Sequence, residues 1–559
     1  MTDIAARNLQ WAWTLIDTFA AAGVREAVIS PGSRSTPLVL ACERHPAVRT
    51  WIQVDERCAG FFALGLARVE RRPAILICTS GTAPAHWYPA VIEASESAVP
   101  LLLLSADRPP ELHDCGANQT INQRRLFGVH VRDFHDLPPA DSADPAIARQ
   151  LATQAWSECT GLRAGPVHLN VPFREPLVPS SLQTPQPSAS HLPVSRTRQK
   201  PRPEQISDLT HAMNGRRGLI VCGWDSGEEG FAGAVSGLAE QLRCPLLADP
   251  LSGVRFGNHS RNAAISRYDA FLRNKGFVAR HQPEWVLRFG AMPVSKALGN
   301  YLQGCEATDF VLIDVTGRRL DPLRRATALV TCDAVPLCEA VAAANPEPAQ
   351  EGWLEGFIEA EQRSALAAHK PPEARIVREL VDQLPPGSLL FSGNSTAIRE
   401  IDSWSGTAAK PLRIIANRGV SGIDGNVSTL AGLAAAHAQR SVGLIGDLAL
   451  YHDMNGLLAA RELDLILVVL NNGGGGIFGY LPQAGLAGFE RNWLTPTGLD
   501  LEQVAQLYAV SYRRVDDAEE FAPALAAALE HHGPQLIEVM IDRAASLEAH
   551  RRYWAAAAR

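Results

Sequence analysis

The sequence predicts an α/β protein made of three doubly wound domains, each built on a parallel β-sheet. Short apolar runs alternate along the chain with longer segments of helical periodicity. This alternation is typical of parallel sheets that are covered by helices on both faces. A length of 559 residues is also too great for a single hydrophobic core, and two proline-rich segments interrupt the pattern.

The proline-rich segments set the expected domain boundaries. The first covers residues 175–203 and is too rich in proline for a helix or a central strand, and the second is centred on residues 345–348. We therefore expect a first domain over residues 1–180, a linker over residues 181–203, a middle domain over residues 204–345 and a last domain over residues 352–559.

Apolar runs in each domain are expected to form its strands. In the first domain they are residues 26–30, 74–79, 101–105 and 167–171; in the middle domain 218–222, 285–289 and 310–314; in the last domain 388–391, 413–416, 441–445, 465–470 and 535–541. Residues 28–34 and 389–395 resemble each other, because each is a strand ending in a small polar turn that opens a helix. This similarity suggests that the first and last domains are related.

The overall composition favours a cytoplasmic enzyme. A hydrophobic content of 46% with 20% charged residues is ordinary for a globular protein, and a net charge of −7 argues against non-specific binding of nucleic acid. The chain shows no apolar run of membrane-spanning length and no basic, apolar leader at Met1. Its ten cysteines form no C-x-x-C pair, and many lie in apolar strand-like runs, as reduced core residues do.

Two polar residues follow neighbouring strands of the last domain. The run 441–445 leads into Gly446 and Asp447, and the run 463–470 leads into Asn471 and Asn472. The 25 positions from Asp447 to Asn472 include a helical stretch with its apolar residues on one face, namely Met454, Leu457 and Leu458. A strand–helix–strand unit of this length brings the carboxyl ends of two parallel strands together, where α/β folds bind ligands.

The pair Asp447 and Asn472 therefore predicts a Mg²⁺–diphosphate site. Both side chains offer hard oxygen donors, and the following glycines (residues 473–476) let the backbone approach a ligand closely. The pattern resembles the thiamine-diphosphate fingerprint Gly-Asp-x, a spacer and Asn-Asn. The alternative is structural: an Asp that caps a strand end and an Asn-Gly turn.

A thiamine cofactor also needs a carboxylic acid, because a hydrogen bond to ring nitrogen N1′ favours the reactive imino tautomer. Glu56 is the candidate, since it stands between a strand-like run and a small, apolar helical segment, residues 59–67. A carboxyl group buried among apolar groups can keep its proton near neutral pH. The alternative is that Glu56 pairs with Arg57 or caps the helix.

Eight motifs together resemble one family across the whole chain, most weakly in the middle domain and the linker. In order they are PGSRSTPL (31–38), VDER (54–57), TSGTA (79–83), ADRPPELHDCGANQTI (106–121), SGNSTAIREID (392–402), ANRGVSGIDG (416–425), GDLALYHDMN (446–455) and NNGGGGIFGYLP (471–482). This set is similar to the 2-succinyl-5-enolpyruvyl-6-hydroxy-3-cyclohexene-1-carboxylate synthases, thiamine-dependent transferases of menaquinone biosynthesis. Two positions depart from the general thiamine pattern: Leu448 replaces a glycine, as is usual in this subfamily, and Gly473 replaces an asparagine.

The resemblance implies the reaction, the cofactors and the assembly. The family decarboxylates 2-oxoglutarate and adds the resulting succinyl carbanion equivalent to isochorismate in a 1,4 sense. It uses thiamine diphosphate with Mg²⁺ or Mn²⁺. It forms homodimers, or dimers of dimers, in which the aminopyrimidine rests on the first domain of one chain and the diphosphate on the last domain of its partner. The three domains are then the pyrimidine-binding, middle and diphosphate-binding domains.

The resemblance also implies the roles of individual residues. Glu56 is the expected catalytic residue and also binds the cofactor, and the metal ligands are Asp447, Asn472 and Gly474. Further cofactor-binding residues are Gly393, Ser395, Ile423, Gly446, Leu448 and Ile477, of which Ile423 would wedge between the two thiamine rings. Substrate-binding residues are Ser33, Arg34, Arg108, Asn118, Gln119, Lys296, Ser395, Arg399, Arg418, Phe478 and Leu481. The four arginines are expected in turns at strand ends, where a guanidinium can bind the carboxylates of both substrates.

Other interpretations stay open at this point. Each arginine could form a surface salt bridge or a helix cap, and Ile423, Phe478 and Leu481 could be plain core residues. Another thiamine enzyme, such as an acetolactate synthase or a 2-oxoacid decarboxylase, would share Glu56, Asp447 and Asn472. A non-catalytic α/β nucleotide-binding module is the alternative from another class, although no G-x-x-x-x-G-K-[ST] or G-x-G-x-x-G motif follows a strand.

Overall fold

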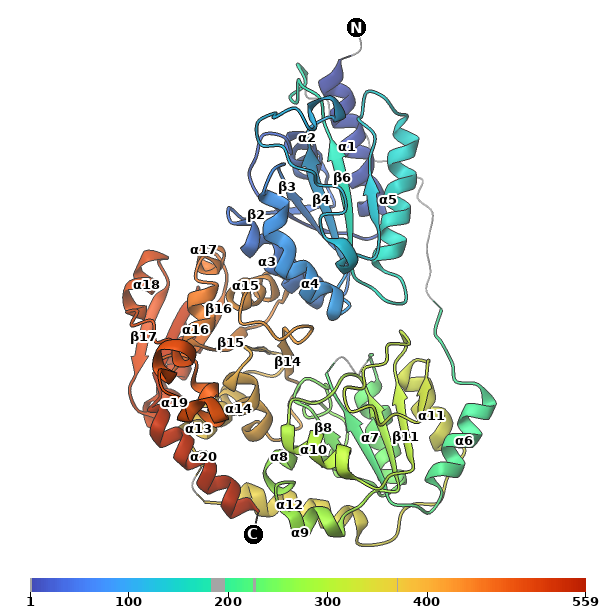
Figure 1. Cartoon of the computed structure of the whole chain (residues 1–559), viewed down its shortest axis with the longest axis vertical. Coiled ribbons are helices and arrows are strands. Elements are labelled where there is room, and N and C mark those ends of the chain that lie inside the picture. The colour runs from blue at the N-terminus through green and yellow to red at the C-terminus, as the bar shows by residue number, and fades with distance from the viewer. Residues whose placement is uncertain (1–2, 182–196, 225–227, 369, 559) are drawn as a thin grey trace. The chain divides into compact units, whose positions relative to one another are not determined.

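The computed structural model describes residues 3–181, 197–224, 228–368 and 370–558. Within these residues the chain forms three six-stranded sheets flanked by helices (Figure 1), so the predicted α/β class with three parallel sheets is confirmed. The described residues fall into two compact units. The first unit comprises the ranges 1–196, 417–438 and 449–465, and the second comprises 197–416, 439–448 and 466–559.

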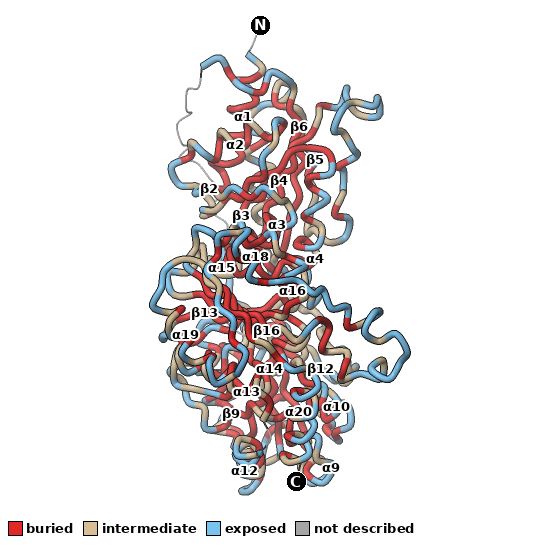
Figure 2. Tube along the Cα trace, turned by 90° about the vertical axis from the view of Figure 1, so that its left-hand side faces the viewer, coloured by how far each residue is buried: buried red, intermediate tan, exposed pale blue. Residues whose placement is uncertain are grey.

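The N-terminal sheet belongs to the first unit and has the strand order β2-β1-β3-β4-β6-β5, with every pair parallel. Its strands are β1 (Glu26–Ile29), β2 (Arg49–Ile52), β3 (Ala74–Cys78), β4 (Leu101–Asp107), β5 (Phe134–Asp136) and β6 (Pro166–Pro172). Its helices are α1 (Ile4–Ala21), α2 (Thr36–Arg44), α3 (Glu56–Glu70), α4 (Tyr88–Glu96) and α5 (Pro145–Cys159). Strands β3, β4 and β6 are buried throughout, as expected when helices cover both faces (Figure 2).

Helix α3 packs closely on α15 (Asn426–Ala436), which belongs to the same unit. A Cβ atom at Gly65 of α3 would lie 2.3 Å from the carbonyl oxygen of Thr429, and one at Gly432 of α15 would lie 2.0 Å from that of Phe62. Only glycine permits this backbone contact. The small residues that follow Glu56 thus bring the N-terminal domain against a segment of the last third of the chain.

The middle sheet has the order β12-β11-β10-β7-β8-β9 and is parallel throughout. Numbered within the domain, this is the 3-2-1-4-5-6 order of dinucleotide-binding folds. The strands are β7 (Gly218–Cys222), β8 (Leu246–Ala248), β9 (Ala264–Ile265), β10 (Trp285–Phe289), β11 (Asp309–Ile313) and β12 (Ala328–Val330). The helices are α6 (Pro203–Met213), α7 (Phe231–Gln241), α8 (Tyr268–Phe271), α9 (Lys275–Arg280), α10 (Lys296–Gly304), α11 (Ala334–Ala343) and α12 (Trp353–Leu366).

The C-terminal sheet has the order β14-β13-β15-β16-β18-β17, which repeats the order of the N-terminal sheet strand for strand. Its strands are β13 (Leu389–Ser392), β14 (Arg413–Ala416), β15 (Ser441–Gly446), β16 (Leu465–Asn471), β17 (Ser511–Val515) and β18 (Gln535–Met540). The associated helices are α13 (Pro372–Gln383), α14 (Thr396–Trp404), α16 (Asp447–His452), α17 (Gly456–Ala460), α18 (Leu501–Leu507), α19 (Phe521–Glu530) and α20 (Arg543–Ala557). The similar turns after β1 and β13 occupy the same place in the two sheets, which supports the suggested relationship between the domains.

Every strand expected from the sequence is present, and each end lies within two residues of its expected place. The missed strands are β2, β5, β8, β9, β12 and β17, and all except β8 are edge strands. Edge strands are hard to recognise because they alternate poorly and expose polar residues; β17, for example, is mostly exposed. The strands of the three sheets lie within residues 26–172, 218–330 and 389–540. The predicted domain boundaries stay predictions. Residues 182–196 of the expected linker lie outside the described chain.

One prediction about the last domain is wrong. We expected a helical stretch between Asp447 and Asn472 that carries Met454, Leu457 and Leu458 on one face, but the segment forms two short helices, α16 and α17, with Met454 between them. Leu457 is buried, whereas Leu458 is 47% exposed and Met454 is only partly buried. Between the two helices, the carboxylate of buried Asp453 accepts hydrogen bonds from the backbone N–H and the hydroxyl of Ser428.

None of the helices in the described residues is both long and apolar enough to cross a membrane. All ten cysteines are free, and only Cys115 is exposed. The interpretation of the cysteines as reduced and mostly buried is therefore confirmed.

Candidate active site

The carboxyl ends of β15 and β16 place Asp447 beside the glycine-rich loop. The two strands are neighbours in the sheet, and the backbone N–H groups of Leu448, Asn472 and Gly474 favour the charged form of the Asp447 carboxylate. Burial raises the pKa of Asp447 to about 6, although these N–H groups oppose the shift. A cation bound here would favour the ionised carboxylate.

The two adjacent asparagines have different environments. Asn471 is structural: its amide donates to the Glu538 carboxylate at 2.5 Å, and its Oδ1 accepts the N–H of Gly473 at 3.1 Å. The Oδ1 atom of Asn472 is buried and has no hydrogen-bond partner among the described residues. Asn471 thus makes a turn onto Gly473, whereas the Oδ1 atom of Asn472 is not used by the turn, and its role as a metal ligand stays a prediction.

The glycines after Asn472 let the loop pack closely on its neighbours. Gly474 has φ +123°, and a Cβ atom there would lie 2.1 Å from the carbonyl oxygen of Leu494. A Cβ atom at Gly476 would lie 2.6 Å from the Asn472 amide nitrogen. The described residues contain no cluster of three His, Cys, Asp or Glu side chains that could hold a metal. The predicted ligands are instead the Asp447 carboxylate, the Asn472 amide oxygen and the Gly474 carbonyl. Such a set suits Mg²⁺, which completes its octahedron with phosphate and water.

The turn after β13 carries Gly393 and Ser395. A Cβ atom at Gly393 would lie 3.2 Å from Cα of Ile445, so the turn lies close against β15. Ser395 has φ +64° and ψ −122° immediately before α14, a conformation that costs energy for a residue other than glycine and is often found at ligand sites. Arg399 was expected in this turn, and that placement is wrong: it lies in α14 and donates to the carbonyl oxygen of Ser395 at 2.5 Å.

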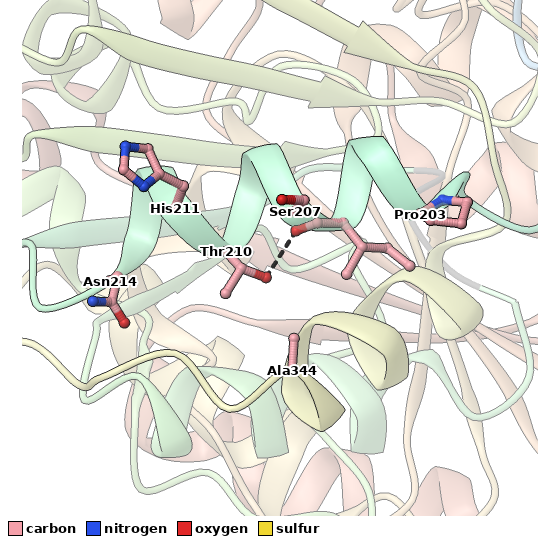
Figure 3. Close-up of a pocket in the computed structure, with 7 residues that line it drawn as sticks. Pro203, Ser207, Thr210, His211, Asn214 and Ala344 are labelled. Atoms are coloured by element: carbon pink, nitrogen blue, oxygen red, sulfur yellow. Dashed lines mark hydrogen bonds between the residues drawn. The ribbon is translucent and has the colours of Figure 1, made fainter.

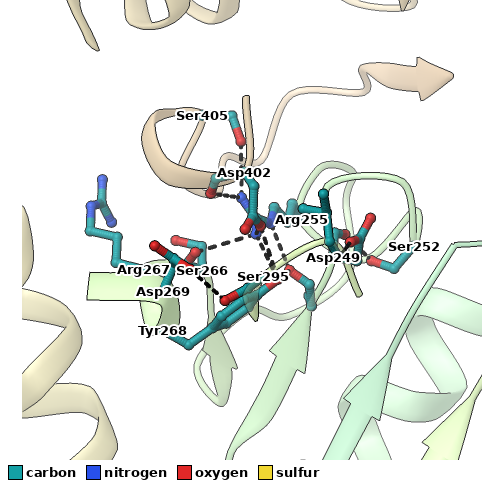
Figure 4. Close-up of polar contacts among 12 residues, drawn as sticks. Asp249, Ser252, Arg255, Ser266, Arg267, Tyr268, Asp269, Ser295, Asp402 and Ser405 are labelled. Carbon is teal, nitrogen blue, oxygen red and sulfur yellow. Dashed lines mark hydrogen bonds and ion pairs between the residues drawn. The ribbon is translucent and has the colours of Figure 1, made fainter. Parts of the chain in front are cut away.

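Helix α14 is held by a buried ion pair to the middle domain, both in the second unit (Figure 4). The Arg255 guanidinium contacts the Asp402 carboxylate at 2.5 Å, the Asp402 carbonyl oxygen at 2.6 Å and the Ser405 hydroxyl at 3.1 Å. The Tyr268 hydroxyl donates to the same carboxylate at 2.9 Å. Because removal of one partner of a buried pair is costly, this contact fixes the helix that carries Arg399.

A second buried network lies on the other side of α14. His550 of α20 contacts Glu400 of α14 at 3.1 Å, and Glu373 of α13 accepts the Ser546 hydroxyl at 2.6 Å. Burial lowers the pKa of His550, but the Glu400 carboxylate more than offsets this and the pKa is raised to about 9. Burial and then Glu400 raise the pKa of Glu373 to about 7. A cavity of about 320 Å³ adjoins this network and reaches Asn472.

Glu56 is the first residue of α3, and its neighbour Asp55 takes the structural roles. Asp55 caps the helix by accepting the Arg57 N–H at 3.0 Å and pairs with the Arg57 guanidinium at 2.6 Å. Asn455 donates to the second Asp55 oxygen at 2.9 Å. The partly buried Glu56 carboxyl makes no hydrogen bond or ion pair within the described residues. Both structural alternatives considered for Glu56 thus belong to Asp55.

The remaining candidates of the N-terminal domain gather at the carboxyl edge of its sheet. Arg34 is buried and donates to the Phe173 carbonyl and the Glu175 carboxylate, both at 2.9 Å. Arg108 donates to the Ser80 hydroxyl, and burial followed by the charge of Arg34 lowers the pKa of Arg108. The positive charges of the two guanidinium groups repel each other, so an anion bound between them would stabilise both charged forms.

Two polar residues that the sequence did not single out organise this edge. Ser80 accepts the side-chain amide of Gln119 at its carbonyl oxygen, 3.0 Å away, and donates its hydroxyl to the Gln119 carbonyl at 3.1 Å. Buried Gln123 accepts the N–H of Gly81 at 3.0 Å and donates to Asn170 at 2.9 Å. Ser80 lies in the quoted TSGTA motif, which was the available signal, whereas Gln123 lies two residues beyond the motif of residues 106–121. They fix the loop on which Asn118 and Gln119 are exposed.

The other candidates occupy loops and helix starts. In the first unit, Ser33 is exposed before α2, and Arg418 and the partly buried Ile423 lie in the loop between β14 and α15. In the second unit, Lys296 is exposed at the start of α10. Gly446 is the last residue of β15, and Leu448 lies at the start of α16. Ile477 and Phe478 lie in the 3₁₀ turn after the glycines, and Leu481 directly follows that turn.

The candidate residues therefore form two groups, one in each unit. The first unit brings Glu56, Arg34, Arg108 and Gln119 to one sheet edge, and the second brings Gly393, Asp447, Asn472 and Gly474 to another. A groove of about 500 Å³ beside α6 has none of the candidate residues in its lining (Figure 3). It is open and has no carboxylate, lysine or arginine in its lining, so it lacks the chemistry of the candidate site.

Sequence models of protein families match all three domains. The "Thiamine pyrophosphate enzyme, N-terminal TPP binding domain" matches residues 10–126, the "Middle domain of thiamine pyrophosphate" matches residues 187–392, and the "Thiamine pyrophosphate enzyme, C-terminal TPP binding domain" matches residues 403–539. The three matches and the three parallel sheets thus define a thiamine pyrophosphate enzyme. This excludes a non-catalytic nucleotide-binding module.

Curated relatives identify the family within this class. Proteins named 2-succinyl-5-enolpyruvyl-6-hydroxy-3-cyclohexene-1-carboxylate synthase match from Dechloromonas aromatica (43% identity, 96% of this chain and 99% of the relative), Chloroflexus aurantiacus (43%, 97% and 95%) and Geobacillus kaustophilus (44%, 98% and 98%). The chain belongs to the 2-succinyl-5-enolpyruvyl-6-hydroxy-3-cyclohexene-1-carboxylate synthase family.

Proposed function

We propose that the protein decarboxylates 2-oxoglutarate and adds the succinyl unit to isochorismate, giving 2-succinyl-5-enolpyruvyl-6-hydroxy-3-cyclohexene-1-carboxylate and CO₂. The names of the relatives support this reaction. The observation that carries it is the buried, unpartnered Oδ1 of Asn472 in the loop that binds the Asp447 carboxylate. An oxygen in that state is costly unless a ligand satisfies it.

At the C-terminal sheet, Asp447, Asn472 and the Gly474 carbonyl would hold Mg²⁺ or Mn²⁺. Glycines at the strand ends let backbone groups approach the diphosphate, and we assign this role to the turns of Gly393 and Gly446 with Ser395, Leu448 and Ile477 beside them. Thiamine diphosphate, when bound, supplies the carbon nucleophile and the electron sink for decarboxylation.

At the N-terminal sheet, Glu56 would hold a proton at the aminopyrimidine ring nitrogen. The carboxyl group is suited to this because Asp55 satisfies the helix and Arg57, which leaves Glu56 without a competing partner within the described residues. It also lies close to the end of β3, since burial and then the Glu56 charge raise the pKa of the Cys78 thiol. We assign Ile423 to the contact between the two thiamine rings.

Both substrates are dicarboxylates, so the site needs cations in a protein of net charge −7. We assign their carboxylates to Arg34, Arg108, Arg399 and Arg418, with Lys296 as a further cation. Polar contacts would come from Ser33, Asn118, Gln119 and Ser395, and the apolar wall from Phe478 and Leu481. The mutual proximity of Arg34 and Arg108 supports the first pair.

We further propose that two chains form a homodimer with active sites shared between the first domain of one chain and the last domain of its partner. The ten free cysteines fit a reducing compartment, which supports a cytoplasmic location.

The reaction can be tested by incubating the protein with thiamine diphosphate, Mg²⁺, 2-oxoglutarate and isochorismate. Mass spectrometry should show the succinylated product, together with one CO₂ for each product molecule. A matched incubation with pyruvate in place of 2-oxoglutarate separates this function from that of an acetolactate synthase. Product from pyruvate alone, and none from the proposed pair, would contradict the assignment.

A further inference from the structure

A buried carboxylate of α4 contacts the loop that carries Arg418. Glu93 is 1% exposed, and its two oxygens accept the N–H groups of Gly419 and Val420, one each, at 2.9 Å. Arg68 of α3 donates to one of these oxygens at 3.0 Å. The carboxylate thus binds the two backbone groups that directly follow Arg418.

The contact is close enough to fix the position of the loop. A Cβ atom at Gly419 would lie 2.8 Å from the Glu93 carbonyl oxygen, 3.0 Å from its carboxylate and 3.0 Å from the backbone nitrogen of Ser97. Burial raises the pKa of Glu93, while Arg68 and the two N–H groups favour its charged form. Charge-assisted hydrogen bonds of this kind are stronger than neutral ones.

The rest of the loop is also preformed on the first unit. Gly425, with φ +63°, lies against the ring of Phe61, because a Cβ atom there would come within 2.0 Å of the ring. Ser421 has φ +60°, and Asn417 donates to the Thr429 hydroxyl at 2.9 Å. The contact with Glu93 lies between these points, one residue after Arg418 and a few residues before Ile423.

We propose that Glu93 is a positioning residue, which sets Arg418 and Ile423 by holding the backbone of residues 419–420. This inference rests on the proposed function, because it takes Arg418 as a substrate ligand. Glu93 itself touches neither substrate nor cofactor. The alternative is a purely structural role in packing α4, and the two roles differ in whether the effect of Glu93 depends on Arg418.

Glu93→Gln tests the proposal because it replaces one accepting oxygen by an NH₂ group that faces a backbone N–H. We expect KM for one of the two dicarboxylates to rise about tenfold, with a smaller change in kcat. In an Arg418→Lys background the same substitution should change KM by less than about twofold, because the positioned group is already impaired. In an Arg34→Lys background the full tenfold change should remain.

A matched control exists in the middle domain. Glu361 accepts the backbone N–H groups of Ser266 and Arg267 at 3.1 and 2.7 Å and pairs with Arg267, but it does not contact residues 419–420. The effect of Glu361→Gln on KM should multiply with that of Arg418→Lys. Glu93→Gln effects that likewise multiply with Arg418→Lys would overturn the proposal.

Two further measurements keep the test decisive. If Glu93→Gln does not fold, Gly419→Ala perturbs the same contact from the loop side and should give the same KM pattern. Amide hydrogen exchange of residues 419–420 needs no substrate, and it should accelerate in Glu93→Gln and stay slow in Glu361→Gln. Unchanged exchange in Glu93→Gln would show that Glu93 does not hold the backbone of these residues. A wild-type protein that makes no product would contradict the proposed function instead. The exchange result would still show whether Glu93 holds the backbone of residues 419–420.

Discussion

The N-terminal and C-terminal sheets share one strand order, yet their carboxyl edges carry different chemistry. The N-terminal edge presents Glu56, Arg34 and Arg108, whereas the C-terminal edge presents Asp447, Asn472 and a run of glycines. In both cases the residue just before the key side chain takes the structural role: Asp55 caps the helix before Glu56, and Asn471 forms the turn before Asn472. A functional group is left available when a neighbour satisfies the backbone.

The two edges also rest on different buried networks. Under the N-terminal edge, His168 contacts Ser105 at 2.7 Å, and burial lowers the pKa of His168 to about 3, so this histidine is neutral. Beside the C-terminal edge, Glu400 raises the pKa of His550 to about 9 against the effect of burial, so this histidine is charged. The two related sheets therefore have buried histidine networks whose contributions to stability change with pH in opposite directions.

The largest expected effect comes from removing the C-terminal carboxylate. Asp447→Ala should lower the Mg²⁺-dependent affinity for thiamine diphosphate by at least about a hundredfold and abolish turnover, because a metal ligand is lost. Isothermal titration calorimetry measures the affinity. Asn471→Ala is the matched control and should lose stability while it keeps metal-dependent binding. Undiminished cofactor affinity in Asp447→Ala would contradict the role of this sheet edge in binding the metal and the cofactor.

Glu56→Gln should give a smaller loss of a different kind. Cofactor binding should persist, but activity should fall about a hundredfold or more, as for loss of a proton-transfer group. Nuclear magnetic resonance should show that the thiamine C2 proton no longer exchanges rapidly with deuterated solvent. The control Asp55→Ala should cost about 1 kcal/mol of stability through the lost helix cap and keep the exchange. Wild-type exchange in Glu56→Gln would refute the role of Glu56.

The charged histidine predicts a loss of stability at alkaline pH. The folded-state pKa of about 9 lies above the ordinary value of 6.5, so the stabilisation by His550 is complete below pH 6.5 and is lost as pH rises to 9. The loss should be about 3 kcal/mol at most. Native-state hydrogen exchange of α20 across this range should show it, and His550→Gln should flatten the profile. An equally steep profile in that variant would contradict the assignment.

The neutral histidine predicts a loss of stability in the opposite direction, on acidification. This loss is small near neutral pH. The folded-state pKa of about 3 lies below 6.5, so stability is complete above pH 6.5 and falls as pH is lowered toward 3. Hydrogen exchange of β4 and β6 should accelerate on acidification in the wild type and less so in His168→Gln. Constant protection of these strands down to pH 4 would show that His168 does not titrate as described.

The sequence was sufficient for the central strands other than β8, and it placed Asp447 and Asn472 at the ends of neighbouring strands. The Asp447–Asn472 pattern follows from strand length and spacing, and the capping role of Asp55 could have been recognised as a helix-start signal. Edge strands such as β2 were missed because they lack a buried face. The contacts of Glu93 with Gly419 and of Arg255 with Asp402 join residues 326 and 147 positions apart, and no local pattern encodes such pairs.

We propose that the two sheet edges supply complementary halves of one site, each from a different chain. Mixing Glu56→Gln with Asp447→Ala chains under conditions of subunit exchange tests it directly. With random exchange about half of the dimers are mixed, and each has one intact site of two, so activity should recover to about a quarter of the wild-type value. Proven exchange with no recovery of activity would contradict the shared site and show that each chain builds its own.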